Sequence, residues 1–217
     1  MLNPLEKIVV IKQFYFANCV FFLIHFSMNN LFIIENLKVI NRILPILKIQ
    51  VHQNEVSFVI KKNHLIPTLT FFKNHTKYQF KILTYISGVD YPLHKYRFKV
   101  VYELLSVKYN SRLRIKILTN ELMPIESCCS LYSTANWYES ETFDMYGIFF
   151  TNHVNLIRLL TDYGFEGYPL RKDFPLSGFV EVSYDFTRKR ITNERVELNQ
   201  EYRAFKFSSP WETLELN

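Results

Sequence analysis

Glycine, cysteine and cofactor-binding motifs are scarce or missing in this sequence. Among 217 residues there are five glycines and three cysteines, namely Cys19, Cys128 and Cys129. No C-x-x-C pair occurs, and adjacent cysteines bridge each other only with strain, so neither a disulfide framework nor a cysteine-ligated zinc or iron–sulfur site is expected. Gly-rich phosphate loops and the H-E-x-x-H and G-x-S-x-G motifs are also missing. We therefore expect no catalytic, cofactor-binding or metal-binding residues. We also expect the protein to reside in a reducing compartment.

A few charged side chains offer alternatives to that expectation. Glu139, Glu141 and Asp144 share a predicted helix and could act as general acids, bases or metal ligands. The sequence shows no second carboxylate cluster, so we expect structural ion pairs, with Glu139 closing a capping box begun by Asn136. The six histidines are isolated from one another, and His153 is expected to cap or pack. Hydrolysis by Asp144 and His153 is the hypothesis with the least support.

Charge is unevenly distributed along the chain. Residues 1–135 contain 17 basic and 7 acidic side chains, whereas residues 136–217 contain 9 basic and 13 acidic ones. A basic half can bind nucleic acid or anionic lipid. Here the basic residues are scattered rather than clustered, and the acidic, glycine-bearing second half suits a protein partner better. We expect a folded domain that docks in a larger assembly, with a basic nucleic-acid-binding module as the competing hypothesis.

Residues 1–34 form a segment of their own. The run from 14 to 34 contains no Asp, Glu, Lys or Arg, and about 20 apolar residues can span a bilayer. Asn18 and Asn29 interrupt this run, and neither a cleavage site nor an Arg- and Ser-rich transit peptide is evident. We expect residues 1–34 to be an extension packed on a partner, with no direct membrane span.

Residues 35–160 alternate between helical and strand periodicities. Predicted helices lie over 37–44, from a cap at Asn63 to Phe72, between Asn136 and Gly147, and over 152–162. Predicted strands lie at 47–51, 56–60 and 78–87, followed by a loop at 88–92 and by a hairpin of strands 96–104 and 113–119. This order indicates an α+β two-layer domain with helices on a mixed, largely antiparallel sheet.

The stretch Thr161–Gly178 concentrates the residues that interrupt regular structure. It holds three of the five glycines and two of the eight prolines. Dense Gly and Pro punctuation excludes a long helix and favours a kinked, extended path in which the glycines take positive φ. Its apolar side chains are too numerous to remain in water. We therefore predict that residues 161–217 form a long extended arm, with a strand at 180–184, that packs on partner subunits.

Aromatic and charged side chains of this arm are the candidates for that interface. Arg171 lies between apolar neighbours, and arginine with aromatics is typical of interface hot spots. We expect Arg171 to pair bidentately with a partner carboxylate. The complete set of partner-interface candidates is Tyr163, Phe165, Leu170, Arg171, Lys172, Asp173, Phe174, Arg203 and Trp211.

Three long runs resemble one known family. They are YESETFDMYGIFF from residue 138, LTDYGFEGYPLRKDFPLSGFVEV from residue 160, and QEYRAFKFSSPW from residue 200. Together they resemble the thirty-kilodalton subunit of respiratory complex I, also called NADH dehydrogenase subunit 9. The likeness extends from about residue 35 to residue 212. The chain departs from the family pattern at Ser140, where an arginine is usual, and at Val154, Asn155 and Ile157.

The resemblance implies a non-redox structural and assembly subunit of the peripheral arm of NADH:ubiquinone oxidoreductase. It would pack beside the quinone-site subunit, which is known as the forty-nine-kilodalton subunit, and beside neighbouring subunits. NAD, FMN, iron–sulfur clusters and quinone would belong to other subunits, and this chain would bind none of them. The composition is typical of an AT-rich organelle genome. We therefore expect a mitochondrion-encoded subunit in the matrix-facing arm at the inner membrane.

Overall fold

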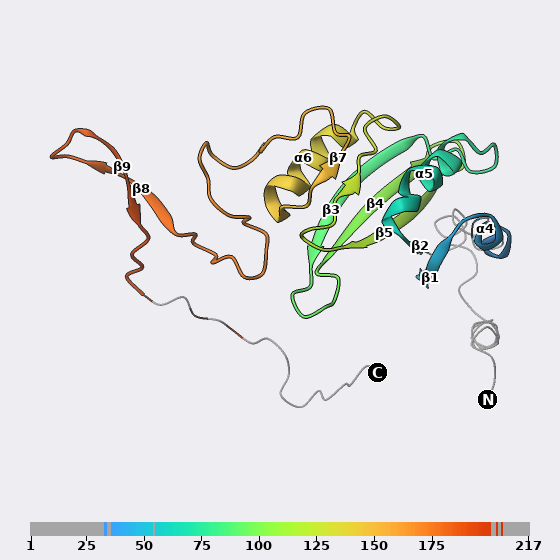
Figure 1. Cartoon of the computed structure of the whole chain (residues 1–217), viewed down its shortest axis with the longest axis horizontal. Coiled ribbons are helices and arrows are strands. Elements are labelled where there is room, and N and C mark those ends of the chain that lie inside the picture. The colour runs from blue at the N-terminus through green and yellow to red at the C-terminus, as the bar shows by residue number, and fades with distance from the viewer. Residues whose placement is uncertain (1–32, 34–35, 54, 201–202, 204, 206–217) are drawn as a thin grey trace, which may run out of the picture. The chain divides into compact units, whose positions relative to one another are not determined.

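The computed structural model describes residues 33, 36–53, 55–200, 203 and 205. The chain divides into two compact units between Lys172 and Asp173. The first unit contains the elements from α4 (Leu37–Ile43) to β7 (Phe150–Thr151), and the second contains β8 (Val180–Asp185) and β9 (Arg190–Arg195) (Figure 1). Apart from Ile33, the predicted N-terminal extension lies outside the described residues. Within the part that is described, no helix combines the length and the apolar character needed to cross a bilayer.

A five-stranded mixed sheet is the framework of the first unit. Neighbouring strands pair antiparallel except in the interior, where β2 and β5 run parallel from Ser57↔Arg114 to Ile60↔Ile117. The prediction of a mixed, largely antiparallel sheet is confirmed. In spatial order the strands are β1 (Ile46–His52), β2 (Glu55–Ile60), β5 (Ser111–Thr119), β4 (Phe98–Ser106) and β3 (Ile82–Asp90).

Alternating side chains specify the predicted hairpin β4–β5. The register runs from Phe98↔Thr119 to Ser106↔Ser111, so Tyr102 lies directly opposite Ile115. Every second residue of each strand is buried on the same face of the sheet. A slip of one residue would turn all of these side chains toward the opposite face, which is why the pattern fixes the register.

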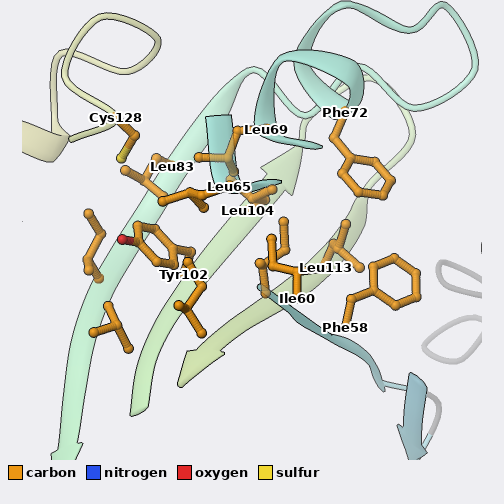
Figure 2. Close-up of a cluster of buried hydrophobic side chains, with 14 of the residues drawn as sticks. Phe58, Ile60, Leu65, Leu69, Phe72, Leu83, Tyr102, Leu104, Leu113 and Cys128 are labelled. Carbon is orange, nitrogen blue, oxygen red and sulfur yellow. The ribbon is translucent and has the colours of Figure 1, made fainter. Parts of the chain in front are cut away.

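Two helices cover the apolar face of the sheet. They are α5 (Leu65–Asn74), entered through the 3-10 turn η3 (Lys62–His64), and α6 (Ala135–Tyr146); the short α4 (Leu37–Ile43) adds Ile40. The ring of Phe72 on α5 lies 5.9 Å from that of Phe58 and 5.8 Å from that of Phe80. Figure 2 shows this layer, in which α5 side chains meet those of β2, β4 and β5. Burial of each such side chain stabilises the fold by about 1.5–3 kcal/mol, which accounts for the predicted two-layer arrangement.

The opposite face of the sheet is polar. Lys116 Nζ donates to Gln50 Oε1 at 2.8 Å and to Ser57 Oγ at 3.2 Å. Arg114 forms ion pairs with Glu103, which it faces across the β4–β5 ladder, and with another carboxylate on β2. An antiparallel sheet commonly presents one such face to water, so the apolar core remains on the side of the helices.

The third strand is displaced relative to its prediction. It spans Ile82–Asp90 rather than 78–87, and the first three residues of the predicted loop at 88–92 belong to the strand. Tyr78 instead packs its ring 5.7 Å from Phe72, in the turn that follows α5. A Cβ on Gly88 would lie 2.6 Å from the ring of Tyr146. Glycine at this position therefore permits a close approach of α6 and does not mark a turn.

Both predicted asparagine caps are wrong. Asn63 lies inside η3, and the residue before α5 is His64, which makes no side-chain capping bond. Asn136 lies in the first turn of α6, which begins one residue earlier, again without a side-chain cap. The predicted C-terminal residue of this helix is confirmed, because Gly147 adopts φ 74° and its N–H bonds to Phe143 O. Instead, the N–H groups of Ala135 and Asn136 donate to the carbonyls of Tyr132 and Ser133, in the turn before the helix.

The described part of the second unit is a two-stranded hairpin. Its strands are β8 (Val180–Asp185) and β9 (Arg190–Arg195), paired antiparallel from Val180↔Arg195 to Asp185↔Arg190. The predicted strand at 180–184 is confirmed, whereas β9 lies in sequence that was expected to form an irregular arm. None of the described residues in this unit is buried.

Candidate functional site

A buried carboxylate on α6 holds the chain that follows the helix. The Asp144 side chain is fully buried, and its Oδ2 accepts the backbone N–H groups of Leu159, Leu160 and Thr161 at 3.1, 2.8 and 2.9 Å. Oδ1 accepts the Thr161 hydroxyl at 2.7 Å and the Arg158 guanidinium at 3.2 Å. Burial by itself raises the pKa of Asp144, but these hydrogen bonds outweigh it and lower the pKa below its ordinary value.

The same carboxylate explains why one predicted helix is absent. Residues 152–162 were expected to be helical, but in the structure they form bends and irregular chain. Three consecutive amides at 159–161 point to one oxygen of Asp144 and cannot also bond to carbonyls four residues earlier. The helical spacing of Val154, Ile157 and Leu160 therefore does not reflect a helix.

A second buried carboxylate, on the last residue of β3, holds the end of this segment. The Arg97 guanidinium donates to both carboxylate oxygens of Asp90. Its Nε donates to Oδ1 at 2.8 Å, and its NH2 donates to Oδ2 at 3.1 Å. The backbone N–H of Lys172 donates to Oδ2 at 2.8 Å. The Arg97 hydrogen bond is the largest influence and lowers the pKa of Asp90, against the opposing effect of burial.

Arg171, expected to clamp a partner, binds its own chain. Its Nε donates to the carbonyl of Tyr146 at 2.8 Å, and its NH1 lies 3.3 Å from Glu121 Oε1. The guanidinium also lies over the rings of Tyr168 and Phe98, at 4.4 and 5.2 Å from their centroids. The carboxylate that Arg171 pairs with is thus an internal one, and the contact fixes residues 168–171 against the end of α6.

Tyr168 and Gly147 complete this anchoring. Arg158 lies 5.0 Å from the Tyr168 ring centroid and donates to the carbonyl of Gly167 at 3.0 Å. A Cβ on Gly147 would lie 2.7 Å from both Arg171 NH2 and the Tyr168 ring. We call residues 152–172 the anchored segment, because its irregular backbone is held by Asp144, Asp90 and Arg171.

The anchored segment presents apolar side chains to solvent. Tyr163 is fully exposed, and large parts of four other side chains are exposed as well, namely Val154, Ile157, Leu160 and Leu170. Trp137 on α6 lines a shallow pocket with Ile157 and Leu159 and is 65% exposed. An exposed apolar surface on a fixed backbone is typical of a protein–protein interface.

Trp137 was missed by the sequence reasoning although it belongs to this surface. Its signal was present in the helix pattern. Glu139 and Asp144 lie on the buried side of α6, and Trp137 falls outside that side. Tryptophan is enriched among interface hot spots, so a tryptophan on the exposed side of a helix indicates an interface.

The structure places the predicted interface candidates in different settings. Within the first unit, Tyr163 and Leu170 are exposed, Phe165 is half-buried, and Lys172 has an exposed side chain above its anchored amide. In the second unit, Asp173 is exposed and Phe174 packs edge-on against Phe179, with the ring centroids 5.4 Å apart. Arg203 is exposed and lies over the ring of Phe205, whereas Trp211 lies outside the described residues.

Glu139, expected to form a structural ion pair and to close a capping box, is a buried carboxylate that accepts hydrogen bonds from the loop after β6. Its Oε2 accepts the Ser127 hydroxyl at 2.5 Å, and its Oε1 accepts the backbone N–H of Cys128 at 2.8 Å. Donor atoms of Cys129, Glu139 and His153 all lie within 4.8 Å of one another. Burial, and then the charge of Glu139, raise the pKa of the Cys128 thiol, so this thiol is a poor nucleophile.

Comparison with known proteins gives a consistent family. The sequence model described as "Respiratory-chain NADH dehydrogenase, 30 Kd subunit" matches residues 58–180. This chain belongs to that family. NADH-ubiquinone oxidoreductase subunit 9 of Reclinomonas americana is 50% identical over 165 residues, which are 76% of this chain and 81% of the relative. A NADH-quinone oxidoreductase subunit of Rhizobium etli (strain CIAT 652) is 53% identical over 166 residues, covering 76% and 83%.

Members of this family thus occur in both mitochondrial-type and bacterial oxidoreductases. The rice protein named NADH dehydrogenase [ubiquinone] iron-sulfur protein 3 is 53% identical over 155 residues, 71% of this chain and 82% of the relative. A chain of an archaeal membrane-bound sulfane sulfur reductase shares the fold with a TM-score of 0.56, over 65% of this chain and 85% of that chain, at 22% identity. The family match covers the sheet from β2 onward, α6 and the whole anchored segment.

Proposed function

We propose that this chain is a non-redox structural and assembly subunit in the peripheral arm of NADH:ubiquinone oxidoreductase. Electrons pass from NADH to quinone through groups held by other subunits, and this chain positions those subunits. In this proposal it binds neither NAD, FMN, an iron–sulfur cluster nor quinone. The anchored segment, with its exposed Tyr163 and Leu160, is the observation that supports the proposal most directly.

The chemistry of the anchored segment suits docking better than catalysis. Asp144 and Asp90 are both buried, hydrogen-bonded and held ionised, so neither is poised to exchange a proton near neutral pH. Their role is to fix a backbone path in advance. A preformed apolar surface loses little conformational entropy when a partner covers it, which favours affinity.

The quinone-site subunit is the partner that we propose for this surface. The chain would then lie in the matrix-facing arm at the mitochondrial inner membrane. The second unit, in which none of the described residues is buried, would extend the contact along the same or a neighbouring subunit.

Photocrosslinking in the assembled complex tests the proposed partner. A photoreactive phenylalanine analogue in place of Tyr163 should give a covalent product with the quinone-site subunit after irradiation. The same analogue at Val107, an exposed position in the β4–β5 turn of the first unit, serves as the control and should not give that product.

The result separates the function from the partner. If residue 163 crosslinks only to other subunits of the complex, the structural role remains and the assignment of the quinone-site subunit as partner is wrong. If the tagged chain migrates only as a free monomer on native gels, the structural role itself is wrong.

A further inference from the structure

The cluster around Glu139 is not needed by the docking function. It joins three separate parts of the first unit: the loop after β6 (Ile125–Glu126), α6, and the turn after β7 (Phe150–Thr151). The side chains of Glu139 and His153 are 0% and 1% exposed. Among the described residues, His153 is the only basic side chain within ion-pair distance of Glu139. A buried carboxylate without a cation is costly.

The hydrogen bonds of His153 show that this residue does not supply that cation. Its Nδ1 accepts the backbone N–H of Asn155 at 3.1 Å, so Nδ1 carries no proton. The ring is therefore neutral with its proton on Nε2, which lies 3.2 Å from the carbonyl of Asn136 and 3.8 Å from Glu139 Oε2. The carboxylate charge is balanced by hydrogen bonds alone.

Two of the three separations among the candidate ligand atoms match those of a metal site, and the third, between Cys129 Sγ and His153 Nε2, is within 4.8 Å. Cys129 Sγ lies 3.5 Å from Glu139 Oε2, and His153 Nε2 lies 3.8 Å from the same oxygen. Tetrahedral zinc with bonds of about 2.0–2.3 Å places its ligand atoms roughly 3.3–3.8 Å apart. The Cys128 thiol lies 3.1 Å from the other carboxylate oxygen, Glu139 Oε1.

An orphaned hydroxyl lies beside this cluster. Tyr102 Oη is buried and has no hydrogen-bond partner in the described structure. Burial raises the pKa of Tyr102, and the neighbouring Cys128 and Glu139 raise it further. In Figure 2 the Tyr102 hydroxyl and the Cys128 thiol lie on the same side of the group of buried side chains. An unsatisfied buried hydroxyl is the kind of group that an ion or its bound water completes.

We propose that Cys129, Glu139 and His153 bind one zinc ion, with a water that bonds to Tyr102 as the fourth ligand. One thiolate and one carboxylate neutralise the charge of the ion, and the thiol proton leaves to solvent. The proton on His153 Nε2 moves to Nδ1, which releases the amide of Asn155. That residue is exposed, so water can accept the freed N–H. The ion would tie α6 to the loops after β6 and β7.

Zinc titration of the full-length chain tests this site. After removal of metal, titration against a chromophoric chelator should show one tight Zn²⁺ per chain. Cys129→Ser and His153→Asn should each weaken binding roughly 100-fold, as expected when one of four zinc ligands is lost. The matched controls Cys19→Ser and His94→Asn remove a cysteine and a histidine elsewhere and should bind as the wild type does.

Two further measurements do not depend on the behaviour of a variant. Co²⁺ in the wild-type chain should give a thiolate-to-metal charge-transfer band and the intense visible bands of tetrahedral cobalt. Added Zn²⁺ should protect Cys129, which is half-exposed, from alkylation. Absence of stoichiometric binding, or equal binding by the Cys129 variant and by the Cys19 control, overturns the proposal. Neither result alters the proposed docking role, which is read from crosslinks.

Discussion

The anchored segment and the β8–β9 hairpin differ in the kind of hydrogen bond that holds their backbones. The anchored segment has no regular structure, yet Asp144 and Asp90 capture four of its backbone N–H groups. The hairpin has a regular ladder, yet none of its residues is buried. An isolated two-stranded hairpin is only marginally stable in water. Regular hydrogen bonding is thus a poor guide to which region is rigid before a partner binds.

Loss of the Asp144 charge should have the largest effect on this difference. Asp144→Asn should reduce the free energy of unfolding by about 3–5 kcal/mol, because the partly buried Arg158 guanidinium and the amides of residues 159–161 lose their buried anionic acceptor. Urea unfolding of the full-length chain measures the change. The matched control Asp162→Asn, at an exposed position, should stay within about 0.5 kcal/mol. Equal effects would show that the segment is not held by Asp144.

Adding a methyl group at Gly147 should have the second-largest effect on the free energy of unfolding. Gly147 and Gly164 both have φ +74°, but a Cβ at Gly147 would meet Arg171 and Tyr168 whereas one at Gly164 would meet nothing within 4 Å. Gly164→Ala should therefore show only the cost of left-handed backbone, about 1–2 kcal/mol. Gly147→Ala adds overpacking and should cost about 2–4 kcal/mol. Thermal unfolding of the two variants compares these two costs directly. Equal costs would mean that Arg171 and Tyr168 move away from the added methyl group without loss of stability.

Lowering the pH should remove the stabilising contribution of Asp90. The pKa of Asp90 is lowered in the folded chain, so its ionised form stabilises the fold at pH above the ordinary value of about 4. That contribution is lost as the pH falls through the ordinary value and then through the folded value. Asp90→Asn should be about 2 kcal/mol less stable than wild type at neutral pH, and the gap should close in acid. Urea midpoints measured across pH 2–7 test this, and a gap that stays constant contradicts it.

The smallest of these effects should appear in hydrogen exchange of the backbone amides, which reports the free energy of local opening. In the full-length chain alone, the N–H groups of Leu160 and Thr161 should exchange slowly, because they are held by a buried carboxylate. Those of β8 and β9 should exchange fast, because opening this exposed ladder costs little free energy. In the assembled complex both regions should be slow. Slow exchange of β8–β9 in the free chain would show that the hairpin is stable without a partner.

The sequence predicts what depends on neighbouring residues and misses what depends on distant ones. Alternation in the sheet is local, so the β4–β5 hairpin and the end of α6 at Gly147 could be read directly. The absent helix at 152–162 could not, because the acceptor for its amides is Asp144 on another element. The same holds for Arg171, whose internal partner Glu121 is 50 residues away. Burial of Glu139 together with two thiols and His153 is likewise invisible in a list of isolated residues.

The parallel seam between β2 and β5 also has a consequence for the order of folding. The β1–β2 hairpin is complete once residue 60 has been made, but its inner partner β5 begins only at Ser111. During synthesis of the intervening residues the backbone edge of β2 is unpaired, for a period of seconds at ordinary translation rates. Phe58 and its neighbours on this unpaired edge can then pair with strands of other chains, which favours aggregation. A nascent chain stalled before Ser111 should therefore recruit chaperones, and one stalled well past Thr119 should not.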